Sequence, residues 1–460
     1  MTIALLLADF ARETKTLPEP TRRAAIRAIF DLFSAAVAGF GTAGGTAARR
    51  AALSTWGAGP AQAWFSSARL TVPGAAFANA AIASMVDLDD GHRAAAGHPG
   101  AAVIPTVFAT ADFARSSVEQ MLTAVALGYE IGVRVSAARD FAKLETMDSG
   151  LWCGLGVAVA ASVLRDLDAG AMANAIAIAG TTAPGQSATC YTRLMGNNVK
   201  EGIPWATAAA LTAVDLAASG FTGPVDLLDD GGRYKQDVLT QDLGRRWQIE
   251  NVYFKSYGCC RWAHAAIDAV LALQEEHAIP ANAIASIEVG TFARALTLNN
   301  DVDPPTIEAA QYSIPFCVAL AAVYGVQALQ PIEEEALGDP KVLALARRIR
   351  LYVDPELDPM FSKAVPARIE LRTSVNRFTK IVLAPKGEPS NPMSSTEVTR
   401  KFETIARPRM GERRVAHFLE AFAAFEAGDA GPLRSALTLA LGIRAQARTS
   451  SRVAERSAAN

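Results

Sequence analysis

Hydrophobic residues in the first two-thirds of the chain recur at helical spacing. After Pro20, one apolar stripe occupies positions i, i+3, i+4, i+7 and i+11 and consists of Ile26, Ile29, Phe30, Phe33 and Val37. Alanine-rich segments of similar length follow at about 75–86, 100–114, 118–135, 153–165, 171–180 and 204–219. Because alanine lets helices approach closely, this pattern predicts an interlocked bundle of helices.

The pattern changes after residue 268. Apolar and polar residues alternate at 287–290 and 368–372, and a third apolar stretch at 378–383 follows a short polar connection, which predicts strands and a hairpin. Helical stretches are expected at about 305–325 and 339–350, and again at about 395–406, 411–427 and 431–442. We therefore predict a mainly α protein: a large all-helical domain (1–267 and 394–445) with an inserted smaller α+β domain (268–393), ending in a polar tail (446–460).

Length and charge limit the possible functions. A chain of 460 residues, half of them hydrophobic, is long enough for two domains with substantial cores. The net charge is −2 and the basic residues are scattered, which gives no footprint for nucleic acid or for an acidic membrane surface. The apolar run at 3–7 is interrupted by Asp9 and has no preceding basic segment, so it does not predict a signal peptide. The uncharged stretch at 309–332 contains Pro315 and is interpreted as a buried core helix.

The cysteines predict neither a disulfide framework nor a structural zinc site. Five cysteines without paired C-x-x-C spacing are too few for either in a chain of this length: Cys153, Cys190, Cys259, Cys260 and Cys317. We expect a cytoplasmic protein in which the adjacent Cys259 and Cys260 serve packing.

One motif is misleading. Residues 39–44 match the G-x-G-x-x-G pattern of dinucleotide-binding proteins. The pattern follows an amphipathic helix and not a strand, and no acidic residue stands at the expected offset. We interpret it as a turn that ends a helix and predict no nucleotide cofactor.

The densest polar segment is the predicted loop at 87–100. It holds three carboxylates and two of the five histidines: Asp87, Asp89, Asp90, His92 and His98. A solvated acidic turn is the simple alternative, and the spacing fits no standard metal site, so we predict no metal. Pro99 is expected at the first position of a helix. The helix dipole would then lower the pKa of His98 and leave a neutral base at pH 7.

Basic residues are also expected near the starts of two other helices. Lys200 precedes the helix at 204–219, and Lys255 and Arg261 lead into the next one. Taken singly, each lysine is more often a solvated surface residue. Together, the side-chain cations and the free N–H groups of helix N-termini suit a substrate with several carboxylates. The planar fork of Arg261 matches a carboxylate, and His264 is expected on the same helix face.

These segments, in this order, resemble the MmgE/PrpD family over nearly the whole chain. The resemblance is carried by 25–39, 76–81, 87–92, 98–100 and 255–264. Members of this family include 2-methylcitrate dehydratase, cis-aconitate decarboxylase and iminodisuccinate epimerase. The resemblance implies a homodimer, a cleft between the two domains, and chemistry without metal or organic cofactor. It also implies catalytic roles for the residues at matching positions: Asp87, His98, Lys200 and Lys255.

Two departures from the family pattern guide the expected reaction. Many dehydratase-like members have a threonine where this chain has Gly91, and a Phe-His-Pro stretch where this chain has Ser-Gly-Leu-Trp-Cys-Gly at 149–154. Without that histidine, we expect epimerisation beside a carboxylate of a small polycarboxylate such as iminodisuccinate, with His98 as the base. The opposite proton carrier is left open between Lys200, Lys255 and a tyrosine such as Tyr257.

Two other functions remain open at this point. The first is a hydro-lyase acting on a tricarboxylate such as 2-methylcitrate, and the second is a non-catalytic helical binding protein with a shallow surface. For an enzyme, the expected substrate contacts are Arg261, Tyr257, His264 and Asp90.

Overall fold

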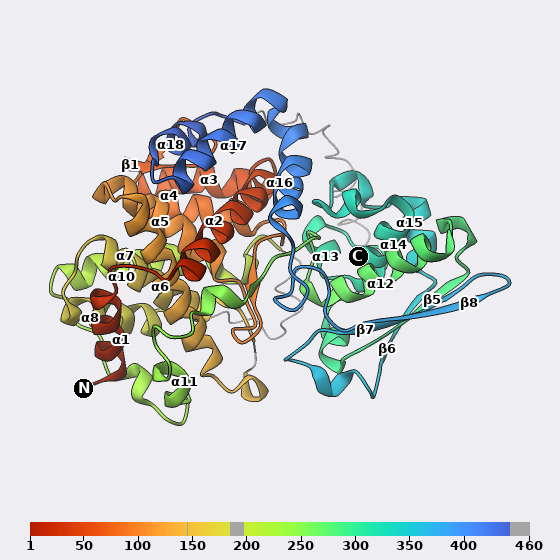
Figure 1. The fold of residues 1–460 in the computed structure, drawn as a ribbon, viewed down its shortest axis with the longest axis horizontal. Coiled ribbons are helices and arrows are strands. Elements are labelled where there is room, and N and C mark those ends of the chain that lie inside the picture. The colour runs from red at the N-terminus through yellow and green to blue at the C-terminus, as the bar shows by residue number, and fades with distance from the viewer. Residues whose placement is uncertain (145, 185–196, 442–460) are drawn as a thin grey trace, which may run out of the picture.

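The structure is a computed structural model that describes residues 1–144, 146–184 and 197–441. Figure 1 shows a larger helical body adjoining a smaller body built around a sheet. The predicted class, mainly α with a smaller α+β unit, is confirmed. Cys190 and the predicted tail at 446–460 lie outside the described residues.

The larger body is formed by N-terminal helices and by three helices that return from the end of the chain. Its helices are α1 (Ile3–Glu13), α2 (Glu19–Phe40), α3 (Ala43–Trp56), α4 (Val72–Ser84), α5 (Gly100–Ala114), α6 (Val118–Ala137), α7 (Cys153–Leu164), α8 (Ala169–Thr181), α10 (Ile203–Ala218), α11 (Gln236–Thr240), α16 (Ser395–Met410), α17 (Glu412–Glu426) and α18 (Gly431–Leu437). A short ribbon of β1 (Ala58–Gln62) and β2 (Arg69–Leu70) lies at its edge.

The apolar stripe predicted for the first long helix is buried in this core. On α2, Phe30 lies 5.2 Å from the Phe402 ring of α16, measured between ring centroids. The next residue, Asp31, accepts a 2.8 Å ion-pair contact from Lys401 of α16, and both side chains are almost fully buried. The C-terminal helices are therefore joined to the first helices by aromatic packing and by a buried charge pair. In Figure 1, α16 lies beside α2.

The smaller body has a four-stranded sheet. Its elements are α12 (Arg261–His277), β5 (Ser286–Thr291), α13 (Ile307–Gln311), α14 (Ile314–Tyr324), α15 (Pro340–Ala346), β6 (Ile349–Val353), β7 (Ala367–Arg372) and β8 (Arg377–Val382). The strand order is β6-β5-β7-β8, with β5 and β6 parallel and the other pairs antiparallel. Strands β7 and β8 form the predicted hairpin. Helix α12 packs on these two strands and on α14.

Two details differ from the sequence-based expectation, and a third agrees with it. The second core begins at Tyr257, about ten residues before the predicted boundary at 267, because the apolar face of α12 packs on the sheet. The expected helix at 339–350 stops at Ala346 and is followed by β6, which pairs with a strand distant in sequence. The Gly-rich segment at 39–44 is the turn between α2 and α3, so the rejection of nucleotide binding agrees with its position.

A small strand pair connects the polar loop of the first body to the segment that enters the second. Strand β3 (Gly91–His92) pairs with β4 (Val252–Tyr253), and Gly91 lies opposite Tyr253. This pairing brings the loop at 87–100 beside the segment that carries Lys255.

Within the described part of the chain, no single helix combines the length and apolar character needed to cross a membrane; the sharply bent pair α2 and α3 meets that test only jointly. Among the same residues, four cysteines are free: Cys153, Cys259, Cys260 and Cys317.

Candidate active site

A pocket of about 570 Å³, counted with its opening to solvent, lies where the two bodies meet. Its lining residues come from both: Asp87, His92, Arg93, Ala96, Gly97, His98, Met147, Glu201, Tyr253, Lys255, Cys260, Arg261, Trp262, Tyr312, Phe361 and Ser362. A recessed pocket does not agree with the shallow surface expected for a non-catalytic binding protein. Four residues predicted for the site, Asp87, His98, Lys255 and Arg261, line it directly.

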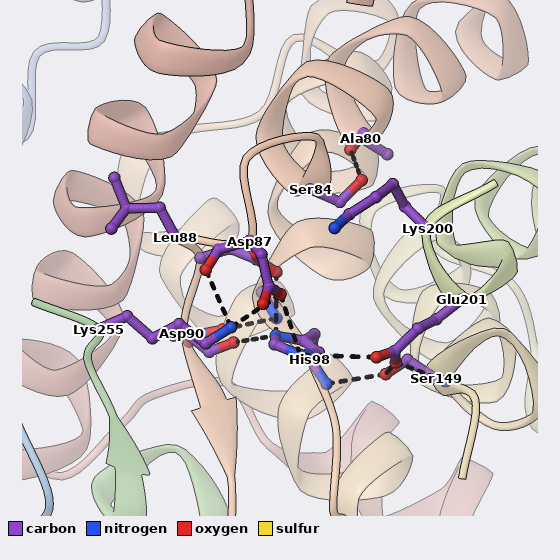
Figure 2. Close-up of polar contacts among 12 residues, drawn as sticks. Ala80, Ser84, Asp87, Leu88, Asp90, His98, Ser149, Lys200, Glu201 and Lys255 are labelled. Atoms are coloured by element: carbon purple, nitrogen blue, oxygen red, sulfur yellow. Dashed lines mark hydrogen bonds and ion pairs between the residues drawn. The ribbon is translucent and has the colours of Figure 1, made fainter. Parts of the chain in front are cut away.

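Asp87 and Lys255 form a buried ion pair at the base of this site. The Lys255 Nζ donates to Asp87 Oδ1 at 2.8 Å and to the Asp87 backbone carbonyl at 3.0 Å. Burial raises the pKa of the Asp87 carboxyl, but Lys255, Lys200 and His98 outweigh it and hold that pKa below its usual range. Asp87 is therefore a carboxylate at neutral pH, and Figure 2 shows Lys255 and Lys200 on different sides of its loop.

Lys200 is fixed by the smaller body. Its Nζ donates to Gln311 Oε1 at 2.9 Å and lies 5.2 Å from the centre of the Tyr312 ring. Lys200, Glu201 and Asp87 all have positive φ, between 48° and 57°. Left-handed backbone costs a non-glycine residue about 1–2 kcal/mol, so tertiary contacts must hold these three residues in place.

His98 has one ring nitrogen bound inside the protein and the other facing the pocket. Its Nδ1 lies 2.8 Å from the Asp90 carbonyl and 3.3 Å from Asp89 Oδ2. Its Nε2 lies 3.9 Å from Asp87 Oδ1 and 3.9 Å from Glu201 Oε1. Among the described residues, no hydrogen-bond partner holds Nε2, which leaves its proton available to a bound molecule.

The expectation that His98 is neutral is wrong. Burial and Lys255 lower its pKa, but the carboxylates of Asp89 and Glu201 outweigh them and raise it to about 9. His98 is therefore an imidazolium at pH 7. Pro99, expected at the first helical position, is the N-cap of α5, and the helix begins at Gly100. The other histidine of this loop, His92, stays neutral because burial lowers its pKa to about 4.

The remaining basic anchors differ from the predicted pattern of helix starts. Lys255 lies in the extended segment after β4, five residues before the N-cap of α12, so it gains nothing from that helix terminus. Lys200 lies in a short 3-10 turn, Lys200–Gly202, that precedes α10. The convergence of cations at the site therefore results from tertiary contacts and not from three helix dipoles.

Arg261 is committed to internal contacts. Its Nε and Nη2 donate to Glu388 Oε1 at 3.0 and 2.9 Å, and Nη2 also donates to the Pro385 carbonyl at 3.2 Å. Its Nη1 contacts His264 Nδ1 and the Lys386 carbonyl, both at 3.0 Å. The guanidinium has five donors, and these contacts use all of them. The bidentate binding of a substrate carboxylate by Arg261 is therefore contradicted by its geometry.

Three other residues predicted to touch substrate support the site from behind. Tyr257 donates its hydroxyl to Asp268 Oδ1 at 2.6 Å. His264 also contacts the Cys259 carbonyl through Nε2, at 3.2 Å. Asp90 accepts from the Tyr129 hydroxyl at 2.7 Å and from the Gly100 N–H at 3.1 Å. None of these three lines the pocket.

Replacement of Arg261 with lysine should therefore act on stability more than on substrate recognition. Loss of its charged hydrogen bonds is expected to lower the free energy of unfolding by about 1.5–3 kcal/mol. We expect the loss in kcat/KM to be similar for a tricarboxylate and for a dicarboxylate analogue. Urea unfolding and steady-state kinetics measure the two effects, and a penalty confined to the tricarboxylate would restore Arg261 as a direct anchor.

Several site residues were not predicted from sequence. Ser149 accepts the His98 N–H at 2.9 Å through its hydroxyl, which itself donates to Glu201 Oε2 at 2.7 Å. Glu201 thereby becomes part of the His98 environment, as Figure 2 shows. Glu201 directly follows the predicted Lys200, and Ser149 is the first residue of the segment that departs from the family pattern, so the sequence offered a reason to include both in the site. It offered no such reason for Arg93 and Tyr253.

Asp87, Asp89 and His98 each offer a ligand atom within 4.8 Å of the others, which is the geometry of a possible metal site. The chemistry of the donor set opposes a cation, because Lys255 already occupies Asp87 Oδ1 and the His98 ring is protonated. We expect dialysis against a strong chelator to leave turnover unchanged. A stoichiometric metal whose removal and return switch turnover off and on would contradict this expectation.

The comparisons with known proteins agree with this geometry. Residues 6–244 match the MmgE/PrpD N-terminal domain and residues 257–427 match the MmgE/PrpD C-terminal domain, so the chain belongs to the MmgE/PrpD family of enzymes. It is 27% identical over 379 residues to the cis-aconitate decarboxylase-like protein oryM of Aspergillus oryzae, covering 74% of this chain and 77% of that protein. It is 25% identical over 378 residues to a cis-aconitate decarboxylase of Aspergillus terreus, covering 74% and 76%.

Proposed function

We propose that this protein is a lyase that acts on a small polycarboxylate, with His98 as the group that delivers a proton. The observation that carries the proposal is the imidazolium of His98, whose Nε2 faces the pocket between two carboxylates. A proton donor of this kind suits elimination and decarboxylation better than it suits the abstraction of a proton by a neutral base.

In decarboxylation, the C–C bond to one carboxylate breaks, CO₂ leaves, and the electron pair passes to carbon. A proton must then bind to that carbon, and the His98 Nε2–H is placed to supply it. The charge that develops on the remaining carboxylate is stabilised by nearby cations, of which Lys255 lines the pocket. The relatives are a cis-aconitate decarboxylase-like protein and a cis-aconitate decarboxylase, which supports an unsaturated tricarboxylate as the substrate class.

A dehydration would use the same side chains, but the proton of His98 would go to the leaving hydroxide and not to carbon. In a dehydration such as that of 2-methylcitrate, a base removes the proton beside a carboxylate, the C–O bond breaks, and His98 protonates the departing hydroxide. Glu201 is the carboxylate we assign as that base, because it lines the pocket beside His98, whereas Asp87 Oδ1 is already bound by Lys255. We place this hydro-lyase reaction second to decarboxylation, since the relatives favour the latter.

Epimerisation of iminodisuccinate, the reaction first expected, is the third candidate. It is favoured by the absence of histidine from 149–154, where Ser149 holds the His98 backbone instead. Epimerisation needs a neutral base on one face and an acid on the other, and the protonated state of His98 favours only the acid role. The homodimer implied by the resemblance and the cytoplasmic location expected from the cysteines belong to this proposal as well, and light scattering of the purified protein tests the homodimer.

One experiment separates these reactions. The purified protein is incubated in D₂O with cis-aconitate, 2-methylcitrate or iminodisuccinate, and ¹H NMR and captured CO₂ are followed together. Decarboxylation is supported by CO₂ release with deuterium on the product carbon. An alkene formed without CO₂ would identify a hydro-lyase, and deuterium exchange with inversion alone would identify an epimerase. If the protein neither binds nor converts any of these polycarboxylates, the proposed substrate class is wrong.

A further inference from the structure

Tyr253 is a pocket residue with a buried ring and a free hydroxyl. The residue is 5% exposed and lines the pocket, yet among the described residues its hydroxyl has no hydrogen-bond partner. The hydroxyl is not one of the fully buried side-chain atoms that lack a partner, so the oxygen itself is open to the pocket while the ring is buried. A phenol with this placement can donate to a molecule bound in the pocket.

The neighbourhood of this ring is built around cations. The guanidinium carbons of Arg93 and Arg261 lie over the Tyr253 ring, 4.7 and 4.8 Å from its centre. Both arginines bind Glu388, which pairs with Arg93 through both carboxylate oxygens and with Arg261 through Oε1. Glu388 thereby fixes two cations against one aromatic ring, an arrangement whose cation–π contacts strengthen as water is excluded.

The two arginines differ in what they have left to offer. Arg261 uses all five donors inside the protein, as described above. Arg93 uses only its Nε and Nη2 in the bonds to Glu388, and in the described residues nothing accepts from its Nη1. Since Arg93 lines the pocket, it retains donors for an anion beside the Tyr253 hydroxyl.

The absence of a side chain at Gly91 leaves room for the Tyr253 hydroxyl. Gly91 lies opposite Tyr253 in the pairing of β3 with β4, and a Cβ at Gly91 would overlap the hydroxyl and Cζ of that tyrosine. A simple structural role for the ring is to cover this glycine, as aromatic residues do across strands. That role needs the ring alone and would leave the hydroxyl without function.

We propose that the Tyr253 hydroxyl and the Arg93 guanidinium form a subsite for a substrate carboxylate that does not react, with Glu388 and Arg261 as positioning residues. The inference rests on the proposed polycarboxylate substrate and adds to it a second anchoring point in the same pocket, besides Lys255. Burial raises the pKa of Tyr253 to about 12 although Arg93 and Lys255 oppose it, so the phenol remains a neutral donor across the working pH range.

The decisive variant is Tyr253→Phe, which keeps the ring and removes only the oxygen. A hydrogen bond to a charged group lost in this way should lower kcat/KM for a tricarboxylate about 10- to 100-fold. For a dicarboxylate lacking the anchored group the loss should be no more than about twofold to threefold. Arg93→Met should show the same substrate dependence. Tyr324→Phe, which removes a surface hydroxyl bonded to Asp339, is the matched control and should behave as wild type.

A second pair of variants tests the geometry. Gly91→Ala should reproduce the loss seen in Tyr253→Phe, because the added Cβ displaces the hydroxyl. In a Tyr253→Leu background, where neither the hydroxyl nor Cζ is present, Gly91→Ala should cause little further loss. An equal penalty of Gly91→Ala in both backgrounds would contradict the direct steric connection.

The outcomes separate this inference from the proposed function. Calorimetric binding of propane-1,2,3-tricarboxylate, an unreactive tricarboxylate, is measured beside turnover. If wild type neither binds nor converts a polycarboxylate, the substrate class and the subsite are both overturned. If wild type is active and Tyr253→Phe matches it with tricarboxylate and dicarboxylate alike, only the subsite is overturned and the ring serves packing.

Discussion

Replacement of His98 with asparagine is expected to lower kcat by about 100- to 10,000-fold, the usual contribution of a general acid or base. Asparagine keeps the approximate size of the side chain and one hydrogen bond to the Asp90 carbonyl but delivers no proton at the position of Nε2. The fold should be unchanged, as circular dichroism and thermal unfolding would show. His417→Asn, at an exposed position of α17, is the control and should retain full turnover.

The pH dependence of kcat shows whether His98 acts as an acid or as a base. Since the pKa of His98 is raised to about 9, the reactive imidazolium is present through neutral pH and is lost above pH 9. The kcat of wild type should therefore be flat near neutrality and then fall about tenfold per pH unit. A kcat that instead increases with pH to an alkaline plateau would show that His98 acts as a base. His98→Asn turning over at the wild-type rate would remove His98 from the mechanism.

The sequence identifies the polar loop of the site but not its charge state. Asp and His residues are more frequent at 87–100 than a simple turn requires, and this density predicts Asp87 and His98 as site residues. The pKa of His98, however, is set by Asp89 in the same loop and by Glu201 from a distant segment. A local argument from the dipole of the following helix therefore predicted the wrong protonation state, because the nearby carboxylates have the larger effect.

The same limit applies to the cations. The helix predicted after Lys255 is confirmed, since α12 begins at Arg261. Its five donors are nevertheless taken by the Glu388 carboxylate, His264 and two backbone carbonyls, and most of these groups lie in a loop more than a hundred residues later. Periodicity shows where a side chain leaves its helix but not which acceptor it meets.

The fold was more predictable than the site because most of its elements are local. The stripe on α2 and the alternation in β7 and β8 depend on spacing within one element. Strand β6 was missed because it is short, follows directly after α15, and pairs in parallel with β5 across three intervening α-helices. The strand pair β3 and β4 has two residues in each strand, too few for alternation to reveal, and it is this pair that places Tyr253 beside the loop.

Removal of Lys255 should have the largest effect on stability. Its side chain is 1% exposed and its Nζ lies 2.8 Å from Asp87 Oδ1, so Lys255→Met leaves a buried carboxylate without its cation. The free energy of unfolding should fall by about 3–5 kcal/mol, as it does when one partner of a buried pair is lost. Lys380→Met, which breaks a pair with Glu276 that is much more exposed, should cost no more than about 1 kcal/mol.

The double variant Lys255→Met with Asp87→Asn distinguishes a charge effect from lost packing. Asparagine tolerates the left-handed backbone at position 87 and removes the unpaired charge, so the double variant should be more stable than Lys255→Met alone. Both variants should lose turnover, because the cation beside the pocket is absent in each. Urea unfolding at pH 7 measures the free energy of unfolding of wild type, the two single variants and the double variant, which together form a double-mutant cycle. Strictly additive penalties would mean that Lys255 and Asp87 stabilise the fold independently, and that the short distance between them contributes nothing.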